Sequence, residues 1–409
     1  MSTLITRREW GLSALAAGAI ANVTKTDKTY AVIGAGVFGS WTAYKLRQAG
    51  HNVLLLDAYG PANMRASSGG ESRIIRASYG KDEIYTRMAV KSLAQWDAFF
   101  QKTGRSLLYR TGVLWIAKPD NAYANESREM LRKVGVPFKD LAPDETQKLY
   151  PQIRVEPGAG AIFEPNSGAL MAREAVQAVV AQFMRDGGQF RHAAVRTPEG
   201  NGHLEQILTS DGSPIRADAF VFACGAWLGR VLPDVLGKKI FPTRQEVFFF
   251  GPLSGDRRFE PPQMPVWIDF GDNGGMYGFP DLDTRGFKVA FDLHGPEFDP
   301  DTGNRFPSPQ KTEEARAYVS ERFPGLAHSP IVGSRVCQYE NSSNGDFVID
   351  RHPAFDNVWI CGGGSGHGFK HGPAVGEYTA ARVLGAADPP IEPRFSLASK
   401  STVQHRSVI

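Results

Sequence analysis

The residues best suited to chemistry in this sequence begin with a glycine-rich turn near the start of the chain. Gly34, Gly36 and Gly39 form a G-x-G-x-x-G pattern, and Asp57 follows 23 positions after the first of them. In such a pattern the first glycine permits a tight turn, the second lets a pyrophosphate approach the backbone, and the third lets a helix pack on a strand. An acid at this distance accepts hydrogen bonds from ribose hydroxyls. These residues predict a dinucleotide site; a glycine turn that binds no nucleotide is the alternative.

The elements needed to position these residues are also present in the sequence. The apolar run 30–33 predicts a strand that enters the turn, residues 40–49 predict a helix that stops at Gly50, and residues 52–57 predict a strand that ends at the acid. The N-terminus of that helix offers free N–H groups and the positive end of its dipole to a phosphate. Because strand, turn, helix, strand and acid occur together, a bound nucleotide is favoured over an empty turn.

The overall composition is that of a globular protein with two or three domains. The chain has 409 residues, of which 42% are hydrophobic and 22% charged, and it shows no low-complexity tract or fixed-period repeat. This composition excludes a disordered chain, a collagen and a coiled coil, and the lack of repeats argues against a solenoid. The net charge of +3 is spread along the chain and gives no reason to expect a nucleic acid partner.

Neither disulfides nor a metal are expected. Three cysteines are too few for a disulfide framework. His367 and His371 are four residues apart, which is the spacing of some helical metal sites. However, Gly366, Gly368 and Gly372 surround them and disfavour a stable helix. The sequence therefore predicts no metal site.

The N-terminus is typical of an export signal. Arg7 and Arg8 form a twin-arginine pair, a weakly apolar run follows at residues 10–21, and residues 19–21 are a small-x-small cleavage site. The run is too short to span a bilayer, which needs about 20 apolar residues. We expect a periplasmic or otherwise exported protein with no stable membrane span. The alternatives are a frayed amphipathic helix and a cytoplasmic protein.

Six further segments follow one another in a recognisable order and spacing. They are ASSGGESRIIRASYG (66–80), FEPNSGAL (163–170), ACGAWLGRVLP (223–233), GFPDLDTRGFKVAFDLHG (278–295), VCQYENSSNGDFVIDRHP (336–353) and CGGGSGHGFKHGPAVGE (361–377). With them, from about residue 30 to about residue 386, the chain resembles the monomeric sarcosine oxidase and N-methyltryptophan oxidase family, FAD-dependent amine oxidases of the larger D-amino-acid-oxidase group. The resemblance selects FAD where the glycine pattern alone leaves NAD open.

The resemblance implies an α/β (α+β) two-domain fold, with a Rossmann-like FAD-binding domain and a second, mainly antiparallel-sheet substrate domain. Apolar periodicity and β-rich runs agree with it. They predict helices at 83–101, 172–187, 311–323 and 374–385, and strands at 204–208, 217–223, 244–250, within 264–293 with a turn at 272–275, and at 357–361. We expect a signal and linker at 1–27, the FAD-binding domain at 28–110, 165–240 and 333–388, the substrate domain at 111–164 and 241–332, and a loosely held tail at 389–409.

The resemblance gives two residues a role at the flavin. Cys337 aligns with the cysteine that is bonded covalently to the flavin 8α carbon, and Arg335 is a candidate to stabilise its thiolate. Lys288 aligns with the lysine that activates dioxygen, where a fixed ammonium stabilises the developing negative charge. Without the resemblance, a cysteine in a strand is more often an inert core residue, and a lysine in a strand is more often solvated.

Two basic residues are expected to bind the substrate. Arg76 and Lys370 align with the pair that grips a substrate carboxylate, where arginine offers a planar fork and lysine a point charge. Surface charges are the alternative, but their apolar and glycine-rich flanks argue against it. Tyr277 and Tyr339 align with aromatic residues that line the amine site, and otherwise are ordinary sheet tyrosines. Besides the glycine turn, Asp57 and Cys337, the predicted FAD-binding residues are Arg65, Ser72, Arg73, Val195, Gly364, Gly366, Gly368 and Lys370.

Two positions depart from the family pattern. Asp292 stands where the family member that handles sarcosine has a histidine, and Gly69 stands where a second active-site histidine is expected. An acid in the pocket could attract a basic substituent, or its side chain could turn outward. These departures put sarcosine itself in doubt as the substrate.

The expected reaction is oxidation of a secondary (N-methyl or cyclic) amino acid to an imine, with dioxygen reduced to hydrogen peroxide. The expected partners are therefore a small amino acid and O2, and the protein is expected to be a monomer. One alternative is a dehydrogenase that passes electrons to a carrier instead of dioxygen. A non-catalytic flavin-binding protein is a more remote alternative, because Arg76, Lys288, Cys337 and Lys370 occur together.

Overall fold

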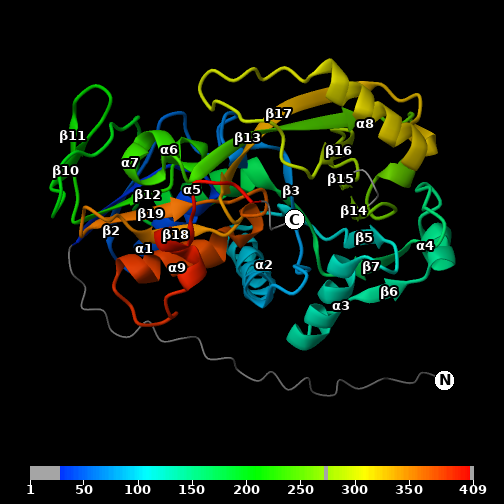
Figure 1. Ribbon diagram of the computed structural model, residues 1–409, viewed down its shortest axis with the longest axis horizontal. Coiled ribbons are helices and arrows are strands. Elements are labelled where there is room, and N and C mark those ends of the chain that lie inside the picture. Colours follow the sequence, from blue (N-terminus) through cyan, green and yellow to red (C-terminus); the bar gives the residue numbers. More distant parts are fainter. Residues whose placement is uncertain (1–27, 271–274, 406–409) are drawn as a thin grey trace.

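The chain folds around two large sheets (Figure 1). The computed structural model describes residues 28–270 and 275–405. The predicted signal segment at 1–27 and most of the turn predicted at 272–275 lie outside the described residues. In the figure, the long paired strands β13 (Ile240–Phe250) and β17 (Ile331–Ser342), which belong to the second sheet, start near the middle of the molecule. No helix in the part of the chain that the structure describes is long and apolar enough to cross a membrane.

The first sheet has six strands in the order β18-β19-β12-β1-β2-β9, and all pairs except β18–β19 are parallel. Parallel strands buried on both faces are typical of nucleotide-binding sheets. Its central strand β1 leads directly into the glycine turn, so the turn lies at the carboxyl edge of the sheet. The strands are β1 (Thr29–Ile33), β2 (Asn52–Asp57), β9 (Gln189–His192), β12 (Ala219–Phe222), β18 (Val348–Arg351) and β19 (Val358–Gly362).

Helices from distant parts of the chain pack together beside this sheet. The first, α1 (Val37–Gln48), packs against α9 (Gly372–Val383) and α5 (Ala172–Arg185), and α9 also contacts α2 (Glu83–Thr103). Gly376 allows the close approach of α9 to α1, because a Cβ atom there would lie 2.6 Å from the Trp41 backbone. The short helices α6 (Leu228–Val231) and α7 (Pro233–Leu236) follow β12.

The second sheet has eight strands in the order β17-β13-β16-β15-β14-β5-β7-β6, antiparallel except for the pair β14–β5. Helix α8 (Pro309–Arg322) packs on β13, and α3 (Ala122–Val134) and α4 (Pro143–Leu149) lie in the β5–β7 connection. The other strands are β16 (Phe287–Phe291), β15 (Met276–Phe279), β14 (Val266–Asp269), β5 (Val113–Ala117), β7 (Gly160–Glu164) and β6 (Lys139–Leu141).

Two small sheets complete the fold. A three-stranded sheet has the order β3-β8-β4, and a hairpin is formed by β10 and β11. Strand β3 lies within the segment 66–80, so this small sheet fixes the position of Arg73 and of Arg76, which directly follows the strand. The strands are β3 (Ser72–Ile75), β8 (Gly168–Met171), β4 (Leu108–Tyr109), β10 (Gln206–Leu208) and β11 (Pro214–Arg216).

The predicted fold class is confirmed, and so are the predicted helices, as α2, α5, α8 and α9. Two predicted domain boundaries fall inside strands, and the boundary at 240/241 separates Ile240 from the rest of β13. The start of an FAD-binding segment at residue 333 falls inside β17, which pairs along its whole length with β13 of the second sheet. Composition does not show that a domain boundary should be moved out of such a strand, because domain boundaries are read from turn residues or linkers and a continuous strand has neither.

The prediction of a loosely held tail is wrong for residues 389–400. Phe395 is only 1% exposed and packs against Tyr85, and Arg394 forms ion pairs with Asp82 and Asp346. Paired charges around one buried aromatic ring hold a segment that has little regular structure. Further along, the Gln404 amide lies 2.9 Å from His294 Nδ1, so the tail reaches the second half of the molecule.

Candidate active site

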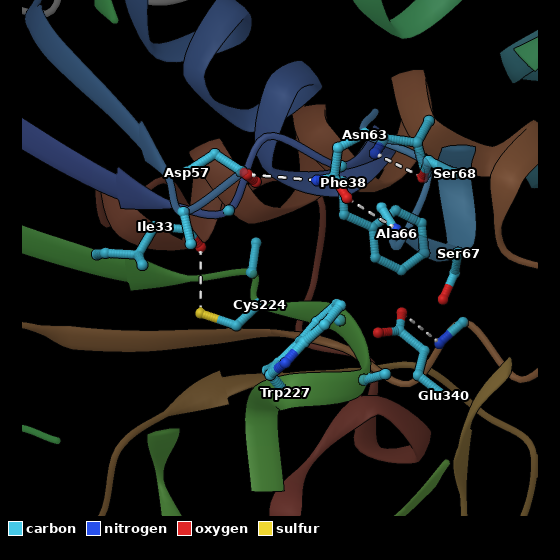
Figure 2. A pocket seen from close by; sticks show the side chains of 18 of the residues that line it. Ile33, Phe38, Asp57, Asn63, Ala66, Ser67, Ser68, Cys224, Trp227 and Glu340 are labelled. Atoms are coloured by element: carbon cyan, nitrogen blue, oxygen red, sulfur yellow. Dashed lines mark hydrogen bonds between the residues drawn. The ribbon is translucent and has the colours of Figure 1, made fainter. Parts of the chain in front are cut away.

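A cavity of about 260 Å³, here called the first cavity, opens at the carboxyl edge of the six-stranded sheet. The ends of β1, β2 and β12 line it together with β17 and the loop before α9. In Figure 2, Asp57 and Cys224 lie toward one side of the view, Ser67 and Glu340 lie toward the other, and Trp227 lies between them along the cavity. Its position matches the crevice in which parallel α/β sheets bind nucleotides.

The glycine turn has the geometry that its pattern predicts. Gly34 has φ +108°, and a Cβ atom there would lie 2.3 Å from the carbonyl oxygen of Ala223. A Cβ at Gly39 would lie 1.9 Å from the carbonyl oxygen of Gly34, so α1 starts in direct contact with β1. Gly34 and Gly36 line the first cavity. No acidic side chain occupies the first turn of α1, so its positive end is open to an anion.

Asp57 fixes the shape of this turn from the end of β2. Its Oδ2 accepts a hydrogen bond from the Ala35 N–H at 2.8 Å, and its Oδ1 accepts from the N–H groups of Tyr59 and Gly60 at 2.8 Å. Burial raises the pKa of this carboxyl above its ordinary value, while the three backbone donors oppose the shift. Asp57 also lines the first cavity, where lone pairs of the same oxygens can accept ribose hydroxyls.

A second glycine loop and a buried acid close the other side of the first cavity. Gly364, Gly366 and Gly368 all line it. Glu340 Oε1 accepts a hydrogen bond from the Gly364 N–H at 3.2 Å, whereas Glu340 Oε2 has no partner among the described residues. Burial raises the pKa of Glu340 to about 7. A buried oxygen without a partner that faces a cavity indicates a missing ligand, and FAD, with its hydroxyls and ring nitrogens, is polar enough to supply that contact.

The remaining predicted FAD ligands divide into two groups. Val195 and Arg73 line the first cavity. The described side chain of Arg65 does not: it donates to the Asp301 carbonyl at 2.7 Å and stacks on Tyr59 at 4.6 Å. Ser72 is also absent from that lining and instead accepts a hydrogen bond from Lys288. The structure thus brings Asp57 and five of the six predicted glycines together on the cavity wall. The predicted FAD-binding residues outside that wall are Gly39, Arg65, Ser72, Cys337 and Lys370.

A second cavity of about 70 Å³ adjoins the first. Arg73, Tyr339 and Gly366 line both cavities and therefore lie at their junction. The second cavity also contains the residues predicted to bind and surround the substrate, namely Arg76, Tyr277, Asp292, Tyr339 and Lys370, together with Trp115 and His294. A group bound across the junction would contact both sets.

The two predicted carboxylate-binding residues meet in the second cavity. The Arg76 guanidinium lies between two aromatic rings, 4.3 Å from the Tyr79 centroid and 4.7 Å from the Trp115 centroid, and donates to the Ser78 carbonyl. Lys370 Nζ donates to Tyr79 Oη at 2.7 Å and to the His367 carbonyl at 2.9 Å. Burial lowers the pKa of Lys370 well below its usual range, and the nearby charge of Arg76 adds to this effect. Two buried cations side by side favour binding of an anion.

Asp292 is half-buried at the wall of the second cavity. It lies just after β16, lines the second cavity, and is close enough to affect the charges of Arg76 and Lys370. The hydroxyls of Tyr277 and Tyr339 lie 3.3 Å apart on the same cavity. The pocket therefore has an acid where the sarcosine-handling relative is expected to have a histidine.

Gly69 cannot be exchanged for a larger residue without movement of the loop, because a Cβ there would lie 1.9 Å from the Asn63 carbonyl oxygen.

Cys337 lies in β17 beside Arg73. Arg73 Nη2 is 3.5 Å from Cys337 Sγ, and the thiol is buried. The predicted partner Arg335 instead donates to Glu71 at 3.2 Å and to the Met64 carbonyl at 2.6 Å. The prediction that Arg335 stabilises the thiolate is thus wrong in detail, because the Glu71 carboxylate draws its guanidinium away. All three cysteines are free, and Cys224 and Cys361 line the first cavity.

Lys288 is buried beneath the motif strand β3. Its Nζ donates to the Ser72 carbonyl at 3.0 Å and to Ser72 Oγ at 3.2 Å, and it lies 4.3 Å from the Phe279 ring centroid. Burial, with the nearby charge of Arg73, lowers its pKa to about 7. Among the described residues Lys288 forms no ion pair, and Glu71, whose charge acts on it, pairs with Arg335 at 3.2 Å. The solvated surface lysine considered from sequence is therefore excluded.

Sequence reasoning missed three residues of the site: Tyr79, Trp115 and Glu340. Tyr79 lies in the recognised segment 66–80, but its hydrogen-bonding partners lie near the other end of the sequence. Trp115 lies in β5, whose apolar run gives no sign that one ring contacts a guanidinium. Glu340 follows Tyr339 in β17, and strict strand alternation would place only one of the two on the cavity. Among the described residues, no group of three or more His, Cys, Asp or Glu side chains could hold a metal ion.

The fold and the two cavities define a class of protein, a flavin-dependent oxidoreductase with separate nucleotide and substrate sites. Residues 29–382 match the family described as FAD dependent oxidoreductase, the DAO family, and the chain belongs to this family. It is 33% identical over 362 residues to monomeric sarcosine oxidase of Bacillus sp. (strain B-0618), covering 86% of this chain and 91% of that protein. It is 30% identical over 379 residues to N-methyl-L-tryptophan oxidase of Yersinia pestis (strain Pestoides F), covering 91% and 99%.

The fold recurs among solved structures. The L-proline dehydrogenase from P. horikoshii superposes with a TM-score of 0.80 at 22% identity, covering 91% of this chain and 97% of that one. The residues present fit FAD, the family's cofactor. The glycine turn at the open end of α1 suits the diphosphate, Asp57 suits a ribose, and Glu340 Oε2 offers an unused hydrogen-bonding atom.

Proposed function

We propose that this enzyme oxidises a secondary amino acid, either N-methylated or cyclic, to an imine and reduces dioxygen to hydrogen peroxide. The observation that carries the proposal is the pair of buried cations, Arg76 and Lys370, in a cavity that joins the FAD cavity at Arg73, Tyr339 and Gly366. A substrate carboxylate held by that pair leaves the adjacent carbon and nitrogen toward the junction. The names of the relatives, a sarcosine oxidase and an N-methyl-L-tryptophan oxidase, support an N-methyl amino acid.

The protein binds and orients the substrate in this proposal. Bound FAD supplies the acceptor for the hydride equivalent that leaves the carbon next to the nitrogen. Arg76 and Lys370 fix the carboxylate and so fix the direction of that C–H bond. Tyr277 and Tyr339 line the wall where the amine lies, and Asp292 sets the charge opposite the carboxylate. An amine that has lost its proton is the reactive form, because its lone pair assists the departure of hydride.

Lys288 supports the oxidase over a dehydrogenase. A buried ammonium without a paired carboxylate can stabilise the negative charge that forms on dioxygen. The fold does not decide between the two reactions, since an L-proline dehydrogenase shares it. The choice therefore depends on Lys288.

Covalent attachment of FAD through Cys337 is part of the proposal. Support comes from the buried Cys337 thiol 3.5 Å from Arg73, a residue of the junction between the cavities.

Export through a twin-arginine signal, and a monomeric state, complete the proposal. Arg7 and Arg8 before a weakly apolar run support export. A pathway that carries folded proteins suits an enzyme that must bind FAD before it leaves the cytoplasm.

The test is a peroxide assay on purified enzyme in air, with N-methylalanine, N-methyltryptophan and proline as substrates. We expect peroxide in stoichiometric amounts with the imine-derived carbonyl or cyclic imine. Flavin that is reduced by these substrates without air, but yields no peroxide when air is admitted, would favour the dehydrogenase. Failure of every amino acid to reduce the flavin would contradict the proposed substrate class.

A further inference from the structure

A single buried tyrosine contacts both cations of the carboxylate-binding pair. Tyr79 lies between β3 and α2 and is only 3% exposed. Its Oη accepts a hydrogen bond from Lys370 Nζ at 2.7 Å, and the face of its ring lies 4.3 Å from the Arg76 guanidinium. The hydroxyl and the ring therefore act on different residues, and one substitution can separate them.

Two buried histidines set the direction of the tyrosine hydroxyl. His367 Nε2 lies 3.0 Å from the Gly345 carbonyl and must donate to it, so His367 Nδ1, 3.2 Å from Tyr79 Oη, presents a lone pair. His371 Nε2 lies closer, 2.7 Å from the same hydroxyl. Burial lowers the pKa of both imidazoles well below the usual value, so both rings are neutral and each has one N–H donor and one acceptor nitrogen.

This arrangement leaves the tyrosine oxygen free to accept. An ammonium has only donors, so the contact with Lys370 requires a lone pair on Tyr79 Oη. The single O–H of Tyr79 then donates to His367 Nδ1, and the Nε2–H of His371 donates to Tyr79 Oη, whose two lone pairs accept from Lys370 and His371. Lys370 uses one further N–H on the His367 carbonyl at 2.9 Å. Its third N–H is left for the second cavity.

We propose that Tyr79 is a positioning residue of the active site: its hydroxyl, oriented by His367, keeps Lys370 cationic and aimed at the substrate carboxylate, while its ring supports Arg76. This inference rests on the proposed function, since it assigns a role within the same site. The charged groups that act on Lys370 are Arg76, which disfavours its ammonium form, and Glu164 and Asp292, which favour it. Tyr79 adds the hydrogen bond that these charges do not provide.

The test uses Tyr79→Phe, which keeps the ring under Arg76 and removes only the hydroxyl. Benzoate, a carboxylate with no C–H bond to oxidise, is titrated into the holoenzyme and followed by the flavin absorption spectrum, with benzamide as the uncharged probe. We expect wild type to prefer benzoate, and Tyr79→Phe to bind benzoate roughly tenfold more weakly, the loss of one hydrogen bond to a charged group. Benzamide binding should not change.

The pH dependence separates this role from a structural one. Without the acceptor oxygen, Lys370 loses its proton at lower pH, so benzoate binding by Tyr79→Phe should fall at a lower pH than in wild type. Tyr85→Phe is the matched control. Tyr85 is equally buried and its ring lies 5.4 Å from that of Tyr79, but its hydroxyl donates to Asp346. This control should bind benzoate as wild type does.

Two results would overturn the inference: unchanged benzoate affinity and pH profile in Tyr79→Phe, or the same loss in Tyr85→Phe. If wild type binds benzamide as tightly as benzoate, the carboxylate-binding pair itself is wrong, and the proposed function fails with it. If Tyr79→Phe does not fold, His367→Leu removes the acceptor of the hydroxyl proton instead and keeps the backbone carbonyl that Lys370 also contacts. It should weaken benzoate binding in the same direction, and an unchanged affinity there would also overturn the inference.

Discussion

Arg73 Nη2 lies 3.5 Å from Cys337 Sγ, across 264 positions of sequence. The arginine comes from β3 in the small sheet and the cysteine from β17 of the eight-stranded sheet, so the contact joins two parts of the fold. Because Arg73 also lines both cavities, the thiol lies beside the place where the nucleotide and substrate sites meet.

This contact predicts where the flavin is attached. Protein precipitated with acid should remain yellow, and Cys337→Ser should release the flavin into the supernatant. Cys361→Ser is the control, because this thiol also lines the first cavity but bonds with Thr379. Free flavin released from wild type, or retained by Cys337→Ser, would show that the attachment is elsewhere or absent.

Lys288→Met should slow reoxidation of the flavin by dioxygen on the order of a hundredfold and change its reduction by substrate much less, because the ammonium acts only once dioxygen becomes negative. Stopped-flow absorbance measures both half-reactions. In wild type, reoxidation should slow as pH rises through about 7, since burial lowers the pKa of Lys288 to that value and the neutral amine carries no charge. Equal losses in both half-reactions would assign Lys288 to structure or substrate binding.

Asp292 predicts the charge of the preferred side chain. An acidic substrate side chain near this carboxylate would meet like charge, whereas a basic or neutral side chain would not. The reduction rate with N-methylaspartate should therefore be at least about tenfold below that with N-methyllysine, and Asp292→Asn should narrow the difference. If N-methylaspartate reduces the wild-type flavin fastest, Asp292 does not act on the substrate.

Export can be tested apart from catalysis. Residues 1–30 fused to a reporter should carry it across the inner membrane, and the double change Arg7→Lys with Arg8→Lys should stop this. The change preserves both charges, so loss of export would show recognition of the arginines themselves. Export that continues unchanged would favour a general secretory signal.

Local patterns predicted the parts of the site that depend on backbone geometry. The glycine turn, α1 and Asp57 lie within one short stretch, and their spacing alone requires the turn observed at Gly34. The resemblance added Arg76, Lys288, Cys337 and Lys370, and the structure places each of them in or beside the two cavities or buried near their junction.

Contacts between distant residues could not be predicted in the same way. Lys370 and Tyr79 are 291 positions apart, and no periodicity links them. Arg335 is closer to Cys337 in sequence than Arg73 is. In the fold, however, Arg335 pairs with Glu71 from a distant segment. The tail is held by the buried ring of Phe395 and by two ion pairs of Arg394. Such contacts produce no apolar periodicity in the sequence, so the sequence did not reveal them. Sequence predicts local geometry, whereas tertiary packing determines these contacts between distant residues.

The most direct test of the account compares substrates that differ only in the carboxylate. N-methylalanine and N-methylethylamine are mixed with the enzyme without air, and the rate at which the flavin absorbance disappears is measured. A carboxylate bound by Arg76 and Lys370 should be worth roughly 2–5 kcal/mol, so N-methylalanine should reduce the flavin at least about thirtyfold more efficiently. Equal efficiency for the two amines would contradict the central claim that this pair of cations selects an amino acid.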